Sequence, residues 1–264
     1  MLIDTHCHLD AAEFDADREQ VIAAARAAGV GLMVVPAVDV ASFGRIKALA
    51  ASRPGIAYAL GIHPLYVDRA TDADLVRLRE AVEQSLADPR FVGVGEIGLD
   101  HFVVGLDRDR QQHFFRAQLA LAAEFSLPVI LHIRRAQDPI LRELRRYRPP
   151  GGTAHAFNGS LQQAGQFIAL GLALGFGGAM SFEGSRRIRR LATDLPAEAI
   201  VVETDAPDIP PAWLAGGRNQ PAELAAIATV LARLRGESPA SVARWSRANA
   251  FRVLPRLAGV GCLD

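Results

Sequence analysis

Two histidines lie two residues apart near the start of the sequence, in the stretch DTHCH at positions 4–8. On a β-strand, residues i and i+2 point to the same side, so His6 and His8 would share one side while Cys7 points toward a helix layer. Two neutral imidazoles together with a carboxylate can bind Zn²⁺, Mn²⁺ or Fe²⁺. The alternative is a pair of hydrogen-bonded polar residues at the end of a strand.

Four further groups of metal-ligand type follow short apolar segments: Glu96 in VGVGEIGLD, His132 in PVILHI, His155 in GTAHAF and Asp205 in IVVETDAP. Glu96 is costly to bury unless it is paired with an arginine or binds a cation, and each histidine could instead be a hydrogen-bonded core residue. Six such groups from five strand ends indicate one metal centre. Since six ligands exceed the needs of one tetrahedral ion, we expect two divalent ions, Zn²⁺, Mg²⁺ or Mn²⁺, bridged by Glu96.

The elements that would position these groups are strands alternating with helices, because short apolar segments alternate with amphipathic ones. Ser160 and Ser238 are candidate helix N-caps. The predicted strands span residues 2–9, 31–37, 57–62, 91–97, 128–133, 152–157, 172–176 and 200–205. The predicted helices include 15–28, 109–125, 160–170, 221–235 and 238–254.

Eight apolar strands joined by helices predict an α/β fold with a parallel sheet buried on both faces. The length of 264 residues fits one (β/α)8 TIM-type barrel, so we expect residues 1–264 to form a single domain. An open doubly wound sheet is the alternative, but the first strand lacks the glycine-rich turn of a dinucleotide site. In a barrel, the carboxyl ends of the strands form one face, where the predicted ligands would converge.

Composition excludes several classes of function. Basic and acidic residues balance at 29 each, so a strongly basic surface for indiscriminate nucleic-acid binding is not expected. Two cysteines, Cys7 and Cys262, are too few for a disulfide framework and fit a reducing compartment. The sequence has no leader pattern and no apolar stretch long enough to span a membrane. We therefore expect a cytoplasmic monomer that does not associate with membranes.

The order of several motifs resembles the TatD family of metal-dependent deoxyribonucleases, within the amidohydrolase-like barrel hydrolases. The resemblance implies a TIM-type barrel that hydrolyses phosphodiester bonds of DNA, with single-stranded DNA as the expected substrate. Carried over by motif, His6, His8 and Asp205 would hold one metal, Glu96 would bridge, and the second metal would be held by His132 and His155. The motifs are DTHCHLD, GIHP, VGEIGLD, LPVILH, HAFNGS, ETDAP and NQP, in that order along essentially the whole chain.

Asp205 and Glu96 are the predicted catalytic residues. Asp205 could accept a proton from water as general base, or it could act purely as a ligand. His63 and Arg134 are predicted substrate contacts, because an arginine can bind phosphate through two hydrogen bonds; a surface arginine is the alternative. His101 and His113 are predicted to be solvated.

Other functions share the same metal chemistry. A metal-dependent amide, lactone or aminoacyl-ester hydrolase, for example a D-aminoacyl-tRNA deacylase, would use the same ligands. A barrel that binds metal or a partner protein without catalysis would be expected to lack some of them. Two arginine-rich stretches, at 142–148 and 186–190, are solvated helix faces unless one lies at the barrel mouth, where it would attract nucleic acid.

Overall fold

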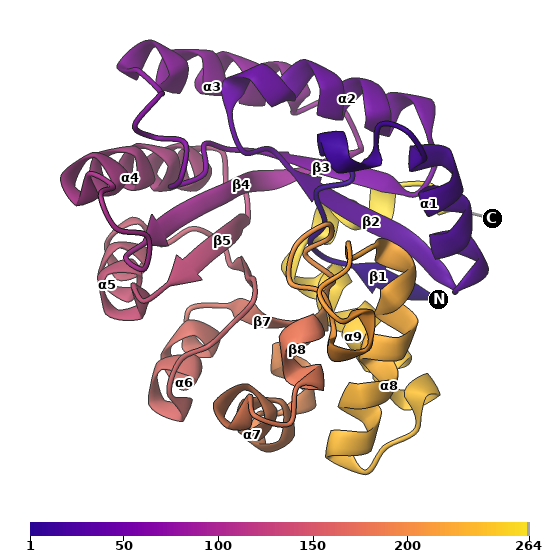
Figure 1. Cartoon of the computed structure of the whole chain (residues 1–264). Coiled ribbons are helices and arrows are strands. Elements are labelled where there is room, and N and C mark those ends of the chain that lie inside the picture. Colours follow the sequence, from indigo (N-terminus) through magenta and orange to yellow (C-terminus); the bar gives the residue numbers. More distant parts are fainter. Residues whose placement is uncertain (263–264) are drawn as a thin grey trace.

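Eight parallel strands form one continuous sheet in the computed structural model, which describes residues 1–262. The strand order follows the chain order, and Figure 1 shows the sheet curling into a barrel. The strands are β1 (Leu2–Asp4), β2 (Val30–Pro36), β3 (Ile56–Leu60), β4 (Phe91–Asp100), β5 (Val129–Arg134), β6 (Gly152–Ala154), β7 (Leu172–Phe176) and β8 (Ile200–Val202).

Hydrogen bonds beyond the ends of β1 and β8 complete the barrel. The backbone nitrogen and the Oγ1 of Thr5 both donate to the Val202 oxygen, at 3.2 and 3.1 Å, and Asp205 N donates to His6 O at 2.9 Å. These contacts confirm the predicted (β/α)8 barrel.

Helices cover the outside of the sheet (Figure 1). The predicted caps are confirmed, because Ser160 accepts a hydrogen bond from the backbone of Gln163, and Ser238 from that of Ser241. None of the helices in residues 1–262 combines the length and apolar character that crossing a membrane requires. The helices are α1 (Arg18–Ala27), α2 (Phe43–Ser52), α3 (Asp72–Ser85), α4 (Arg108–Glu124), α5 (Gln137–Tyr147), α6 (Leu161–Ala169), α7 (Arg186–Asp194), α8 (Leu224–Arg235) and α9 (Pro239–Val253).

The strands separate two apolar cores. On β2, Leu32 and Val34 face the barrel interior, whereas Met33 and Val35 pack toward the surrounding helices. The interior core includes residues from the end of α9 and from the 3-10 helix Pro255–Gly259, which close the amino-terminal end of the barrel. The carboxyl ends of the strands are therefore left as the open end.

Two buried glutamines of α4 hold strand ends at the open end in place. The Gln118 amide accepts from Ile62 N at 2.7 Å and donates to Ile62 O at 3.1 Å. Gln111 pairs in the same way with the backbone of Asp100, at 2.9 and 3.1 Å. Each glutamine satisfies backbone groups that the sheet leaves unpaired.

Several predicted strands extend too far at their carboxyl ends. β3 ends at Leu60 instead of residue 62. β1, β6 and β8 end at Asp4, Ala154 and Val202, so His6, His8, His155 and Asp205 lie in the connecting segments just beyond them. Strand alternation was therefore the wrong reason for pairing His6 with His8. The segment that follows β1 turns toward the centre of the barrel for another reason. Its backbone forms hydrogen bonds with residues of β2 and β8. β4 is longer than predicted and ends at Asp100. Helices α2 and α3 were not predicted, whereas α5 and α7 contain most of the two arginine-rich stretches that were expected to be helix faces.

Candidate metal centre

Glu96 lies at the centre of the open end and is only 1% exposed. The pairing of β4 with β5 shifts register between Val94 and Ile97, and Glu96 N donates instead to Ala37 O at 2.9 Å. Such irregularities re-aim a side chain. The Glu96 carboxylate is thereby brought among the histidines of the neighbouring strand ends.

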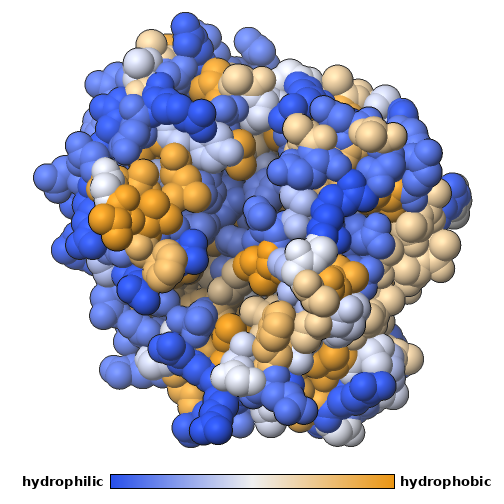
Figure 2. Space-filling view, in the orientation of Figure 1, coloured by the Kyte–Doolittle hydropathy of each residue, from blue (hydrophilic) through white to orange (hydrophobic). Residues whose placement is uncertain are grey.

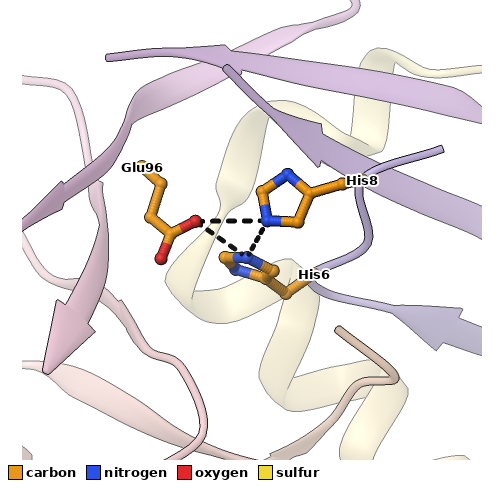
Figure 3. A group of neighbouring side chains, drawn as sticks. All are labelled: His6, His8 and Glu96. Carbon is orange, nitrogen blue, oxygen red and sulfur yellow. Dashed lines mark hydrogen bonds and ion pairs between the residues drawn. The ribbon is translucent and has the colours of Figure 1, made fainter. Parts of the chain in front are cut away.

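One oxygen of Glu96 faces the histidines that follow β1. Its Oε2 lies 3.1 Å from His6 Nε2 and 3.4 Å from His8 Nε2, and the two Nε2 atoms are 3.3 Å apart. Figure 3 shows the three side chains pointing toward one another. Asp205 joins them, since its Oδ1 lies 3.4 Å from His6 Nε2 and 3.7 Å from His8 Nε2.

The other oxygen of Glu96 faces a second group of histidines. Its Oε1 lies 3.0 Å from His132 Nδ1, 3.2 Å from His155 Nε2 and 3.3 Å from His63 Nε2. His63 Nε2 is also 3.0 Å from His132 Nδ1. Each Glu96 oxygen therefore has its own set of imidazoles, as a carboxylate that bridges two cations would require.

Within residues 1–262, three side-chain triads could each hold an ion, since their donor atoms lie within 4.8 Å of one another. One of them contains His63, which was predicted as a substrate contact. The signal that could have found it is GIHP, where the histidine lies three residues after the end of the apolar β3. The triads are His6, His8 and Glu96; His6, His155 and Asp205; and His63, Glu96 and His132.

Carboxylates outside these triads lie behind two of the imidazoles, one of them at hydrogen-bond distance. Asp100 Oδ2 lies 3.1 Å from His132 Nε2, opposite the nitrogen that faces Glu96. Glu203 Oε1 lies 3.6 Å from His155 Nδ1 and accepts from Ala156 N at 2.5 Å. A carboxylate behind an imidazole fixes its orientation and raises its basicity as a ligand.

Gly175 makes room for Glu203. A Cβ atom at position 175 would lie 2.1 Å from Glu203 Oε2, so any larger residue at this position would collide with the carboxylate.

Asp4 connects the two segments that carry the first group of ligands. Its carboxylate accepts from Thr204 Oγ1 at 2.6 Å, from Thr204 N at 3.0 Å and from His6 N at 3.3 Å. Burial raises the pKa of Asp4 to about 8, although these hydrogen bonds oppose the rise. The role of Asp4 was not predicted, and its place in DTHCH, two residues before His6, is the only local signal.

The electrostatics of the centre favour positive charge beside Glu96. Burial lowers the pKa of His6 to about 3, which leaves this imidazole neutral and able to donate a lone pair. Burial also acts to lower the pKa of His8, but the hydrogen bond and charge of Glu96 outweigh it and raise the pKa to about 9. The charges of Glu96 and Asp205 likewise overcome burial and raise the pKa of His155 well above its usual value.

Several buried polar atoms of the centre have no partner with hydrogen-bond geometry among residues 1–262. They include Oε2 of Glu96 and Oε2 of Glu203. Buried polar atoms in folded proteins are nearly always paired, so we expect these atoms to bind a further group. Imidazole nitrogens and carboxylate oxygens around such atoms fit a divalent cation such as Zn²⁺ or Mn²⁺.

The centre lies in a cavity of about 1140 Å³ that opens at the carboxyl ends of the strands. Figure 2 shows this hollow, lined mainly by hydrophilic residues, with hydrophobic residues on parts of its rim. Charged side chains of both signs line the cavity, and one of the arginines, Arg45, pairs with Asp10 at 2.9 Å. The charged lining residues include Arg45, Arg134, Arg135 and Arg187 and the acidic Asp10, Glu13 and Asp208.

The remaining predicted residues divide between the cavity and the surface. Arg134 ends β5 with its side chain 50% exposed and lines the cavity. His113 is exposed on α4 and lies 3.0 Å from Asp72, whereas His101 is only partly exposed. Cys7 is fully buried in the core between barrel and helices, away from the triads.

Comparisons with known proteins agree over the whole length of the chain. A family model described as TatD related DNase matches residues 3–255. The uncharacterized metal-dependent hydrolase YjjV of Escherichia coli K12 is 40% identical over 243 residues, covering 92% of this chain and 93% of the relative. The 3'-5' ssDNA/RNA exonuclease TatD of Erwinia billingiae is 34% identical over 265 residues, covering 96% and 98%.

Solved structures share the fold. The crystal structure of the E. coli YjjV protein, a TatD homolog, superposes with a TM-score of 0.92 at 38% identity, covering 96% of this chain and 98% of that one. A TatD family hydrolase from Entamoeba histolytica has the same fold at 17% identity, with a TM-score of 0.84. The chain belongs to the TatD family of metal-dependent hydrolases.

Proposed function

We propose that this protein is a two-metal nuclease that hydrolyses phosphodiester bonds of single-stranded nucleic acid, with DNA as the expected substrate. The proposal rests on the position of the Glu96 carboxylate, whose two oxygens face separate sets of imidazoles. Two ions held about 3.5–4 Å apart by a shared carboxylate are typical of enzymes that hydrolyse phosphate esters. The TatD relative from Erwinia billingiae, described as an ssDNA/RNA exonuclease, supports the choice of substrate.

The ligands would divide between the two oxygens of Glu96. His6, His8 and Asp205 would hold one ion beside Oε2. The other would be held beside Oε1 by His132 and His155, with His63 as a neighbouring donor. When bound, divalent ions would supply Lewis acidity, which lowers the pKa of water and neutralises charge on phosphoryl oxygens.

The chain's own residues would carry the remaining steps. Asp205 uses Oδ1 toward His6 and His8, so its Oδ2 is left to accept a proton from the attacking water. Burial raises the pKa of Asp205 to about 6, and the charge of a bound divalent cation would act in the opposite direction, so this carboxylate would be ionised and able to accept a proton at neutral pH. Arg134, at the cavity wall, would bind a phosphate oxygen of the substrate.

Purified protein should cleave 5'-labelled single-stranded DNA, lose this activity in EDTA and regain it with Mg²⁺, Mn²⁺ or Zn²⁺. Elemental analysis should find about two metals per chain, in keeping with a two-metal centre. His6→Ala should lose metal and activity, whereas His113→Ala, on the exposed face of α4, should keep both. Equal cleavage by the parent and His6→Ala would overturn the proposed centre.

The same centre could attack a carbonyl group. An amide, lactone or aminoacyl-ester substrate, such as D-aminoacyl-tRNA, is therefore the second candidate. Cleavage of such esters without cleavage of DNA would replace the nuclease assignment and leave the metal centre unchanged.

A further inference from the structure

The loop after β4 presents apolar side chains at the rim of the cavity. Phe102, Val103 and Val104 are 42%, 38% and 96% exposed. Figure 2 shows a hydrophobic patch on the rim above the end of β4. Exposed apolar patches next to a cavity commonly mark binding sites.

Two consecutive arginines reach the same aromatic ring. The guanidinium carbon of Arg134 lies 3.9 Å from the centre of the Phe102 ring, and that of Arg135 lies 4.6 Å away. Neighbouring residues of a regular strand point in opposite directions. Arg135 has a φ of +55°, in the left-handed region, and this turn brings both side chains to Phe102. We call Phe102, Arg134 and Arg135 the rim cluster.

The rim cluster keeps its positive charge available. Arg134 approaches a carboxylate only at 4.0 Å, from Nη1 to Asp100 Oδ2, and no carboxylate of residues 1–262 lies within 4.0 Å of Arg135. Both arginines line the same cavity as Glu96 and the histidines. Another arginine of the cavity wall, Arg45, is paired with Asp10 at 2.9 Å, so the rim cluster offers a polyanion positive charge that is not neutralised by a close ion pair among residues 1–262.

Asp100 ties the rim cluster to the metal centre. Its Oδ1 accepts from Phe102 N at 2.8 Å and from Val103 N at 3.0 Å, while its Oδ2 faces His132 Nε2. His101 N donates to Arg134 O at 2.8 Å, which extends the pairing of β4 with β5. A ligand on the rim cluster would therefore lie at a fixed position relative to His132.

We propose that the rim cluster binds one nucleoside unit of a single-stranded nucleic acid next to the scissile phosphate. The base stacks on the aromatic and guanidinium surface, and the arginines bind the adjoining phosphate. An aromatic platform with arginines beside it is how proteins hold unpaired bases without reading their sequence. A base within a duplex would be covered by its neighbours, so the cluster selects single strands. This inference rests on the proposed nuclease function.

The test compares two probes on the metal-loaded protein by fluorescence anisotropy. One is fluorescein-labelled single-stranded dT10 with phosphorothioate linkages, and the other is an abasic strand of the same length and linkage. Phe102→Leu should weaken binding of dT10 about 5- to 30-fold, within the range for loss of one base–aromatic stack, and change abasic binding less than about twofold. Arg135→Gln should weaken both probes and reduce the slope of log affinity against log salt by about 0.7.

Arg247 and Phe251 of α9 provide a matched control, since they form a similar pair at 5.7 Å outside the cavity. Arg247→Gln and Phe251→Leu should leave both affinities unchanged, and melting curves should show that every variant is folded. Equal binding of dT10 by Phe102→Leu and the parent would overturn the inference, as would equal weakening of both probes.

Kinetics on unmodified dT10 separate the two proposals. If the parent cleaves dT10 and Phe102→Leu has the same kcat/KM, only the rim cluster assignment fails. If the parent neither binds nor cleaves dT10, the nuclease proposal and the rim cluster assignment fail together.

Discussion

The two ends of the barrel differ in how their buried side chains are paired. At the closed end, the Arg256 side chain donates to three backbone oxygens of residues 86–91, and the Asn249 amide donates to two near β8. At the open end, the two glutamines of α4 are paired with the backbone, but Oε2 of Glu96 and Oε2 of Glu203 have no hydrogen-bond partner among residues 1–262. The paired groups stabilise the fold, whereas the two unpaired carboxylate oxygens fit the metal-binding role proposed above, at the end of the barrel where enzymes of this fold have their active sites.

Glu96→Gln should give the largest effect, because it removes the charge that both sets of imidazoles face. Activity on single-stranded DNA should fall by more than the roughly 10- to 100-fold that loss of an outer partner costs. Metal content should drop from both positions, as measured by elemental analysis. The melting temperature in EDTA should also fall, because His8 and His155 lose the carboxylate charge that raises their pKa values. Unchanged metal content and activity would contradict the assignment of Glu96 to the open-end site.

Asp100→Asn tests the support behind His132. The variant keeps the side-chain size but loses the charge, so metal affinity or activity should fall about 10- to 100-fold. Metal titration and kcat/KM would measure this. The free energy of unfolding at pH 7 should fall as well, because hydrogen bonds with His132 and the backbone of residues 102 and 103 outweigh burial and lower the pKa of Asp100 to about 2. Asp109→Asn, at an exposed position of α4, is the matched control and should behave like the parent.

Arg256→Met tests the closed end. Three backbone oxygens would lose a charged donor, and the free energy of unfolding should fall by about 2–3 kcal/mol. Urea unfolding would measure the loss, and kcat/KM of the folded variant should be unchanged. Arg247 is exposed on α9, so Arg247→Met should lower the free energy of unfolding much less. A variant with parent stability but reduced turnover would reverse the assignment of the two ends.

Asp88→Asn should have the smallest effect and depend on pH. Burial acts to raise the pKa of Asp88, but hydrogen bonds from the Arg90 side chain and backbone outweigh it and lower the pKa. A lowered pKa stabilises the fold at pH values above the unfolded pKa, near 4, and this contribution is lost as the pH falls through the lower folded value.

At pH 7 the variant should therefore be less stable than the parent by about 1 kcal/mol, measured by urea unfolding. The difference should shrink as the pH is lowered below about 4, near the unfolded pKa. A difference that stayed constant with pH would show that the charge of Asp88 contributes nothing.

The sequence predicted the barrel and the six groups at its open end because both depend on local patterns. Apolar segments alternate with amphipathic ones. Glu96 and His132 directly follow such a segment, and Asp205 lies three residues after the end of another. The assignment of these groups as metal ligands stays a prediction that the experiments above test.

The structure adds contacts that local patterns could not reveal. Asp4 pairs with Thr204, 200 residues away, and Gln118 pairs with Ile62, 56 residues away. Phe102 meets Arg135 only because of a left-handed turn in the backbone. These contacts depend on how strands and helices pack in three dimensions. For the same reason, the predicted ends of β1, β3, β6 and β8 were wrong.

The pairing of Asp4 with Thr204 also orders events during synthesis. The ribosome releases the first histidines long before it releases the segment that carries Asp205. A nascent chain that has not yet docked its last strand against its first therefore lacks Asp205, although the other five proposed ligands precede it in the sequence. We expect hydrolytic competence to arise only when this strand closes the barrel.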